Sequence, residues 1–313
     1  MNYLKPHKSY INEWKSVSDD VKTLVEYIAN LMWEKSQNDK PTLDSVLKIP
    51  FITGDFYLPM NNVFKDNQPH FGIDGLNIWY KLYFVDSEKE YNRLYSEFGN
   101  SEYEDKEKRV YIRGGLIRGD FNKGLVEDLY HELNHAFEYG MGMEKREELY
   151  NTVYKILTNT NSSIIESAMC RIIYYTFPHE QDAFTHQFYG YLKEHDFYLP
   201  FDDILPTFNP YVDFSRCVMI YTSYLNNNYE AVKKVLNEVG MDIEQFNKRY
   251  KFGDKRFEKK LRRVYQRYMY EQQRKRLNIE GVIKSDFATN NILEEYKKRY
   301  KDIKLEDYKD FIW

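Results

Sequence analysis

The spacing of apolar residues predicts a helix over residues 10–35, where "VKTLVEYIANLMW" repeats apolar positions at helical intervals and "NDKP" ends the pattern. Residues 51–64, "FITGDFYLPMNNVF", contain Gly and Pro and predict an irregular segment. Two stretches rich in β-branched and aromatic residues, Leu76–Val85 and Arg109–Gly119, predict strands. A glycine pair in the second strand, Gly114 and its neighbour, predicts a bulge or a close backbone approach.

The second strand leads into residues 124–140, "GLVEDLYHELNHAFEYG", where apolar residues recur at helical spacing. Almost all of the chain beyond this helix has the same pattern, interrupted by short loops rich in Asn, Pro and Asp. The helices predicted there cover residues 145–158, 162–175, 179–194, 211–225, 228–239, 254–276 and 291–303. The chain therefore predicts a mostly helical α+β fold, with a small sheet beside a helical majority.

The domain organisation follows from the length and from where the pattern changes. A chain of 313 residues can form one large domain or two modest ones. We expect residues 1–70 to form an N-terminal helix and an irregular segment, and residues 71–205 to form a central domain with the sheet. Residues 206–313 then form a helical C-terminal region that contains a basic helix.

Composition restricts the class of protein. The chain is 42% hydrophobic and 30% charged, which is typical of a globular protein. Cys170 and Cys217 each lie in an apolar run, which favours buried thiols in a reducing compartment. The first residues lack the apolar segment of a signal peptide, and no run of about 18 apolar residues occurs anywhere. We therefore expect a cytoplasmic protein that does not enter the membrane.

Residues 124–140 contain the sequence H-E-x-x-H as His131, Glu132 and His135. On a helical wheel of about 100° per residue, the two histidines lie about 40° apart, on a different face from the apolar residues. Both imidazoles can then bind one metal ion, with the carboxylate of Glu132 beside the open coordination position. The alternative is a solvated helix with incidental histidines, but a chance match in this composition has a probability of about 1%. The apolar stripe of this helix consists of Leu125, Leu129, Leu133, Ala136 and Phe137.

A catalytic zinc site needs a third protein ligand, and several downstream residues qualify. Glu180 shares its helix face with apolar residues, and a carboxylate in such a place must be paired, liganded or neutralised. It also follows Pro178, so its position is equally that of an acidic residue in the first turn of a helix. Glu166 lies off the apolar stripe of its own helix and ranks second. The full set of candidates is Glu166, His179, Glu180, Asp182 and His186.

With these motifs the sequence resembles the zincin metallopeptidases whose third ligand is a glutamate on a second helix. "HELNH" matches the metal-binding and catalytic helix, and "HEQDAF" is similar to the E-x-x-A pattern of compact zincin domains in phages and mobile elements. The resemblance covers roughly residues 75–195. It implies that Zn²⁺ is bound by His131, His135 and Glu180, and that Glu132 is the general base. It also implies that residues 109–119 form an edge strand, beside the active-site helix, along which an extended peptide lies.

The function that this resemblance implies is zinc-dependent hydrolysis of peptide bonds in a protein or peptide substrate. Tyr174, Tyr175 and His186 lie near the proposed third ligand in the sequence and are candidates for stabilising the oxyanion. The alternative is a structural or assembly protein, for example a phage virion component, that keeps a zincin fold with little or no catalysis. Metal content and activity on an unfolded protein would discriminate between the two.

A third hypothesis is a nucleic-acid-binding protein, and it depends on residues 248–276. This segment contains 13 Lys or Arg and 3 Asp or Glu, which gives it a net charge of +10 and leaves −14 for the rest of the chain. The charge would suit an acidic or polyanionic partner. A helix of this kind is also typical of a solvated face whose long side chains cover a core. Its apolar stripe consists of Phe257, Leu261, Val264, Tyr265 and Tyr268.

We expect no tight binding of DNA or RNA by this helix at physiological salt. Its apolar stripe already explains why a helix forms there, and its long basic side chains explain its other, solvated faces. Titration of duplex DNA at increasing salt tests this. A true polyanion site would show a slope of roughly −0.9 in log K against log salt for each neutralised phosphate. A nanomolar, salt-sensitive complex that is lost when Arg262, Arg263 and Arg267 are changed to Glu would contradict the expectation.

Overall fold

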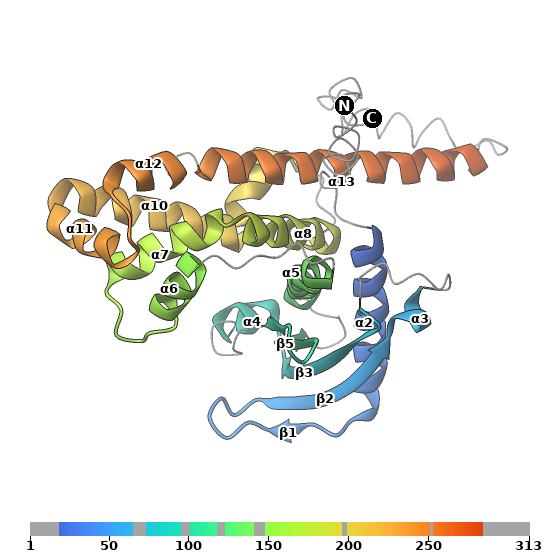
Figure 1. The fold of residues 1–313 in the computed structure, drawn as a ribbon. Coiled ribbons are helices and arrows are strands. Elements are labelled where there is room, and N and C mark those ends of the chain that lie inside the picture. The colour runs from blue at the N-terminus through green and yellow to red at the C-terminus, as the bar shows by residue number, and fades with distance from the viewer. Residues whose placement is uncertain are drawn as a thin grey trace, which may run out of the picture. The chain divides into compact units, whose positions relative to one another are not determined.

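The computed structural model describes residues 19–64, 73–94, 101–117, 123–140, 148–195, 199–250 and 253–283 (Figure 1). By its internal contacts the chain divides into two units, Val17–Lys259 and a second unit composed of Met1–Ser16 and Lys260–Trp313. The sheet and all helices up to α12 belong to the first unit. Of the second unit, the structure describes only the continuation of α13 from Lys260 to Ile283.

A five-stranded mixed sheet lies at one side of the first unit. Its order is β1-β2-β3-β5-β4, and all neighbouring strands are antiparallel except β3 and β5, which are parallel. Both predicted strands are confirmed, as β3 and β5; residues 118–119 of the second lie outside the described residues. The strands are β1 (Thr42–Leu43), β2 (Pro50–Pro59), β3 (Gly75–Val85), β4 (Glu102–Glu104) and β5 (Arg109–Ile117).

The prediction of an irregular segment at residues 51–64 is wrong, because most of it forms β2 and pairs with β3 along its whole length. Gly54 suggested a turn, yet it lies in the middle of the strand opposite Tyr80. A Cβ atom at Gly54 would lie 2.3 Å from the hydroxyl of Tyr80, so the glycine makes room for a buried ring. Pro50 is the first residue of β2, a position where proline is tolerated, and Pro59 is the last.

The prediction that residues 109–119 form an edge strand is wrong for the first residues of β5, because these pair with β4. β4 pairs with β5 only at Arg109, Val110 and Tyr111, so from residue 112 to 117 its one strand partner among the described residues is β3. Its register with β3 is unbroken through Gly114, so the predicted bulge is not formed. A Cβ at Gly114 would lie 3.4 Å from a methyl carbon of Leu125 in the next helix, which is an ordinary side-chain contact and not the predicted close backbone approach.

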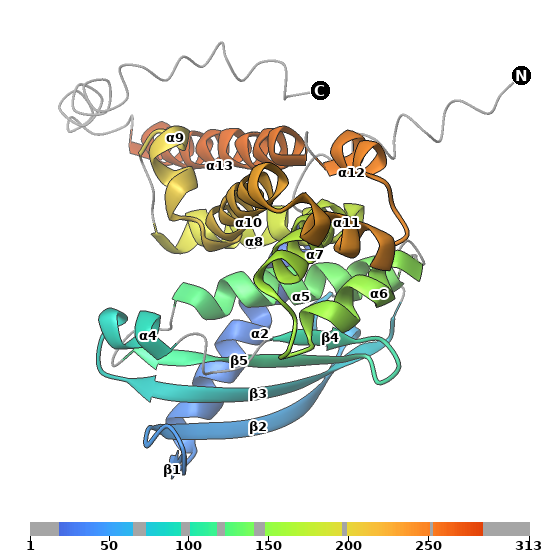
Figure 2. The same ribbon diagram turned by 90° about the vertical axis from the view of Figure 1, so that its left-hand side faces the viewer.

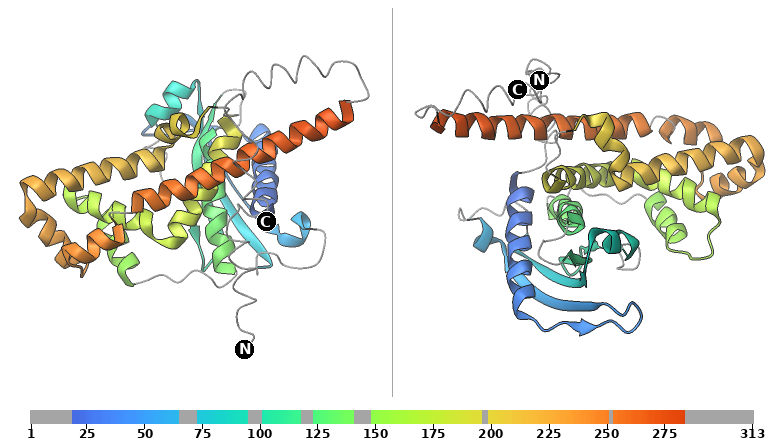
Figure 3. Two further views of the ribbon diagram at one scale, coloured as in Figure 1. Left: turned by 90° about the horizontal axis from the view of Figure 1, so that it is seen from above. Right: turned by 180° about the vertical axis from the view of Figure 1, so that it is seen from behind.

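Long helices pack across one face of the sheet, and a short helix lies near the end of β3 on the other face (Figures 2 and 3). α2 (Asp19–Asn38) crosses the strands, and α5 (Lys123–Gly140) packs on β5 and on α2. α4 (Glu88–Leu94) lies on the opposite face, where Leu94 joins a small apolar cluster with Tyr83 and Val85. The predicted N-terminal helix is thus confirmed from Asp19 onward, and residues 10–18 lie outside the described part of the chain.

The remainder of the described chain is helical, which confirms the predicted mostly helical α+β fold. The segments at 201–207 and 243–250 were not predicted as helices, and the predicted helix 291–303 falls outside the described residues. The further elements are α3 (Met60–Val63), α6 (Glu148–Leu157), α7 (Ile164–Thr176), α8 (Pro178–His195), α9 (Phe201–Ile204), η2 (Leu205–Thr207), α10 (Asn209–Asn227), α11 (Tyr229–Glu238), α12 (Ile243–Tyr250) and α13 (Gly253–Ile283).

Three further predictions concern single residues or whole helices. Cys170 and Cys217 are free and buried, as their apolar surroundings predict. Phe257, the first residue of the apolar stripe of α13, is fully buried and packs its ring against Phe184 and Phe214. None of the helices in the described ranges combines the length and the apolar character needed to cross a membrane.

α5 carries the H-E-x-x-H motif, and α8 carries the proposed third ligand. The contact between these two helices brings the motif and the ligand together. Gly190 of α8 lies against Tyr130 of α5, and a Cβ at Gly190 would lie only 2.6 Å from a carbon of that buried ring. The absence of a side chain at Gly190 therefore permits the close approach of α8 to α5.

We expect Gly190→Ala to lower the free energy of unfolding by about 1–3 kcal/mol, because an added methyl group in a tight core forces displacement. Urea unfolding of the single variants and of Gly190→Ala combined with Tyr130→Leu measures the effect. The loss in the double variant should be smaller than the sum of the single losses, because the smaller residue removes the clash. Additive losses would show that the two residues do not interact in this way.

Candidate metal centre

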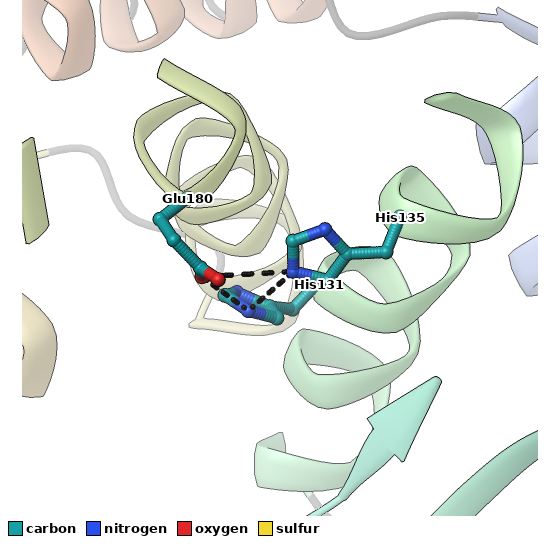
Figure 4. A group of neighbouring side chains, drawn as sticks. All are labelled: His131, His135 and Glu180. Atoms are coloured by element: carbon teal, nitrogen blue, oxygen red, sulfur yellow. Dashed lines mark hydrogen bonds and ion pairs between the residues drawn. The ribbon is translucent and has the colours of Figure 1, made fainter. Parts of the chain in front are cut away.

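Two helices bring the three predicted ligands together. His131 and His135 lie one turn apart on α5, and Glu180 lies in the first turn of α8 (Figure 4). Ala183, Phe184 and other residues of the apolar face of α8 are buried with Glu180, as the sequence predicts. The placement of Glu180 after Pro178 at the start of the helix is also confirmed.

The donor atoms of the three residues converge. The two Nε2 atoms of His131 and His135 lie 3.3 Å apart, and each is 3.6 Å from Oε2 of Glu180. Ligands held about 2.0–2.1 Å from one ion at roughly tetrahedral angles are separated by about 3.3 Å. The separations in this group therefore fit a single ion between the three side chains, with only a slight contraction.

The burial of the group also favours a cation. The exposed fractions of His131, His135 and Glu180 are 8%, 9% and 1%. Burial by itself raises the pKa of Glu180, but the imidazoles of His135 and His131 outweigh it and hold that pKa well below its usual range. The carboxylate is thus ionised in a buried place, and its Oε2 is farther from both imidazoles than a normal hydrogen bond. A metal ion could be held by these three residues.

Glu132 lies on α5 between the two histidines in sequence and is 7% exposed. Burial raises its pKa, and the carboxylates of Glu180 and Glu102 raise it further, while His131 and His135 act in the opposite direction. Glu132 therefore differs from Glu180, because its surroundings favour uptake of a proton.

The second oxygen of Glu180, Oε1, lies near Tyr150 and His179. The Tyr150 hydroxyl donates a hydrogen bond of 3.3 Å to Oε1 of Glu180, and Nε2 of His179 lies 3.6 Å from the same oxygen. Nothing in the sequence around Tyr150, "ELYNTVYKIL", indicated this role. The contact joins α6 to α8, and no local pattern could have revealed it.

Tyr174 of α7 also interacts with the group. Burial raises the pKa of its hydroxyl well above the usual range, and the neighbouring carboxylates of Glu180 and Glu132 add to the effect. The side chain is partly exposed. Its hydroxyl therefore lies near the predicted ligand Glu180, and the charge of Glu132 also acts on it.

Among the described residues, the converging donor atoms include none from the other four candidates, Glu166, His179, Asp182 and His186, although His179 lies 3.6 Å from Oε1 of Glu180. Glu166 forms a capping box with Ser163 at the start of α7 and an ion pair of 2.9 Å with Lys234, which explains why it lies off the apolar stripe. His186 Nδ1 interacts with the carbonyl oxygen of Asp182 at 2.8 Å.

On the side of the site near the sheet, Ser101 connects α5 to β5 through hydrogen bonds. Its hydroxyl donates a hydrogen bond of 3.0 Å to Asp128, one turn before Glu132 on α5, and accepts one of 3.2 Å from the backbone N–H of Arg113 on β5. This contact fixes the open edge of β5 beside the helix that carries the histidines. Burial raises the pKa of Asp128 to about 7, with a smaller contribution from Glu132.

The pKa of Asp128 predicts a pH-dependent stability. Between the unfolded value of 3.8 and about 7 the native state binds a proton that the unfolded state does not, so stability falls as pH rises through this window. Asp128→Asn keeps an acceptor for Ser101 and removes the charge. We expect the variant to be more stable than the parent by on the order of 2 kcal/mol at pH 8, and by little near pH 4.

Urea unfolding at the two pH values, with chelator present in all samples, measures this difference. Asp74→Asn, at an exposed position, is the matched control and should show no such change. A stability difference between Asp128→Asn and the parent that does not vary with pH would show that Asp128 is ionised in the native state at both values.

No family model, curated protein or solved structure matches the chain. The choice among possible functions therefore depends on the chemistry of the residues described above.

Proposed function

We propose that the protein is a zinc-dependent hydrolase of peptide bonds in a protein or peptide substrate. The observation that carries the proposal is the convergence of His131 Nε2, His135 Nε2 and Glu180 Oε2, with Glu132 on the same helix. Two imidazoles and one carboxylate are a donor set of catalytic zinc sites, in which a fourth position stays open. The donor set thus favours zinc and a catalytic centre over a closed structural site.

A bound Zn²⁺ supplies Lewis acidity, which activates water and polarises a carbonyl group. Glu132 then serves as the general base: it accepts the proton of the attacking water and returns it to the leaving nitrogen. The raised pKa of Glu132 suits this double role, because a carboxylate with a higher proton affinity is a stronger base. Its burial also limits competing exchange with solvent.

Tyr174 is the best placed of the three predicted oxyanion donors. The hydroxyl of Tyr175 donates to Asp213 at 2.9 Å, and one ring nitrogen of His186 is engaged with a backbone carbonyl. Tyr174 instead interacts with Glu180 and Glu132. We assign it to donate a hydrogen bond to the oxygen that becomes negative during attack on the carbonyl.

The open edge of β5 favours an extended peptide as the substrate. Beyond Tyr111 this strand has a strand partner on one side only among the described residues, and β5 packs against α5. An added strand would gain backbone hydrogen bonds there. The hydroxyl of Ser101 already occupies the N–H of Arg113, so the free length begins beyond that residue.

The test of this proposal is metal content combined with activity. We expect one zinc per chain by elemental analysis, bound tightly by the parent and by Glu132→Gln, which keeps its metal because Glu132 is not a ligand. Cleavage of an unfolded protein substrate should fall at least 100-fold in Glu132→Gln, because the proton acceptor is lost. Glu180→Ala should lose both metal and activity.

Glu166→Gln is the matched control, since it changes the rival glutamate while an amide can still accept the capping hydrogen bond. It should keep full zinc content and full activity. Absence of any transition metal in the parent would rule out the metal centre. Stoichiometric zinc without hydrolysis of unfolded proteins would favour the alternative, a structural or assembly protein that keeps the site.

A further inference from the structure

The two carboxylate oxygens of Glu180 have different partners. Oε2 is 3.6 Å from each of the imidazoles of His131 and His135. Oε1 accepts a hydrogen bond of 3.3 Å from the hydroxyl of Tyr150 and lies 3.6 Å from Nε2 of His179. One oxygen is therefore directed to the metal position and the other to the protein behind it.

We propose that Tyr150 is a positioning residue: its hydroxyl holds Oε1 of Glu180 so that only Oε2 is offered to the metal. This inference rests on the metal centre of the proposed function and extends it to a residue outside the H-E-x-x-H helix and the third-ligand helix. The consequence is a monodentate carboxylate. A monodentate ligand keeps the coordination number low and leaves the fourth position to water or substrate.

The surroundings of Tyr150 keep its hydroxyl in place. Its side chain is 7% exposed, and its ring packs on Phe177 and His179 with centroids 5.4 and 5.1 Å away. The ring also stacks on Tyr154, with centroids 6.1 Å apart and planes only 11° apart. A ring held by aromatic neighbours loses little further freedom when its hydroxyl binds, so the hydrogen bond to Glu180 is pre-organised.

Tyr150 has a stronger claim to this role than His179, although both lie near Oε1. The hydroxyl is within hydrogen-bonding distance and is a neutral donor, whereas the nitrogen of His179 is 3.6 Å away and its ring stacks on Phe177. Burying a tyrosine rather than a phenylalanine is favourable only when the hydroxyl finds a partner. Glu180 is that partner.

Replacement of Tyr150 by Phe tests the proposal. Residues that orient a metal ligand usually change metal affinity by about 10- to 100-fold. We expect Tyr150→Phe to bind Co²⁺ about 10-fold or more weakly than the parent when the full-length chain is titrated with Co²⁺ alone. The visible spectrum of bound Co²⁺ should also lose intensity, because a released Oε1 can bind the ion as well and raise its coordination number.

The matched control is Tyr154→Phe, one turn along the same helix, where the side chain is 48% exposed and stacks on the same ring. It should bind Co²⁺ with the affinity and spectrum of the parent. An unchanged affinity and spectrum in Tyr150→Phe would overturn the proposal. A spectrum altered equally by both substitutions would also overturn it, because the effect would then come from packing of α6.

A second variant, His179→Phe, covers the case in which Tyr150→Phe fails to fold. If Tyr150 holds Oε1, this variant should retain Co²⁺ affinity within a few-fold and an unchanged spectrum. A loss of 10-fold or more would assign the role to His179 and overturn the proposal.

The same titration separates this inference from the proposed function. A parent protein that does not bind Co²⁺ at one ion per chain would remove the metal centre on which both depend. A parent that binds Co²⁺ and does not hydrolyse peptides would contradict the proposed activity alone, while the comparison of Tyr150→Phe with Tyr154→Phe would still decide the role of Tyr150.

Discussion

The buried carboxylate of Glu180 is the constraint on which the rest of the site depends. An ionised carboxylate that is withdrawn from water costs several kcal/mol unless positive charge or hydrogen bonds compensate it. Glu180 is 1% exposed and its pKa is lowered, so it is charged, and the compensation comes from neighbours that include His131, His135, Tyr150 and Tyr174. The imidazoles compensate fully only when protonated. A divalent cation between the three donor atoms removes that requirement, because it supplies the charge while the imidazoles stay neutral.

The carboxylates near this point are divided into two kinds by their surroundings. The histidines act on both Glu180 and Glu132, yet the pKa of Glu180 falls while that of Glu132 rises, since for Glu132 burial and the other carboxylates prevail. Acids whose pKa values are pushed apart in this way are suited to different roles, one as a permanent anion and one as a proton carrier. Burial raises the pKa of Glu127 and Asp128 on the same helix as well. The concentration of buried acids along α5 therefore costs stability whenever these acids are ionised.

The parts of the site that the sequence could predict are those set by local periodicity. His131 and His135 are one helical turn apart whatever the tertiary structure, and the apolar face of α8 placed Glu180 inside the protein. Tyr150 and Ser101 could not be found in this way, because each reaches the site from an element that meets α8 or α5 only in the folded chain. The same distinction explains the missed strand β2. In the local sequence, Gly54 interrupts a strand pattern. In the fold it lies opposite Tyr80 on the neighbouring strand, where a side chain would clash with the ring of that tyrosine.

The position of Glu180, the proposed third ligand, depends more on packing than the positions of the two histidines. The separation of 3.3 Å between the imidazole nitrogens follows from a single helix, whereas the 3.6 Å from each to Glu180 depends on how closely α8 approaches α5. That approach is permitted at Gly190 and reinforced at the other end of α8 by the aromatic rings behind its first turn. A tyrosine suits position 150, behind the first turn of α8, because its ring fills the core as a phenylalanine ring would. Its hydroxyl also donates a hydrogen bond to one oxygen of the Glu180 carboxylate. In this chain, with its 30 tyrosines, the same residue type can therefore fill the core and also bind a buried carboxylate through its hydroxyl.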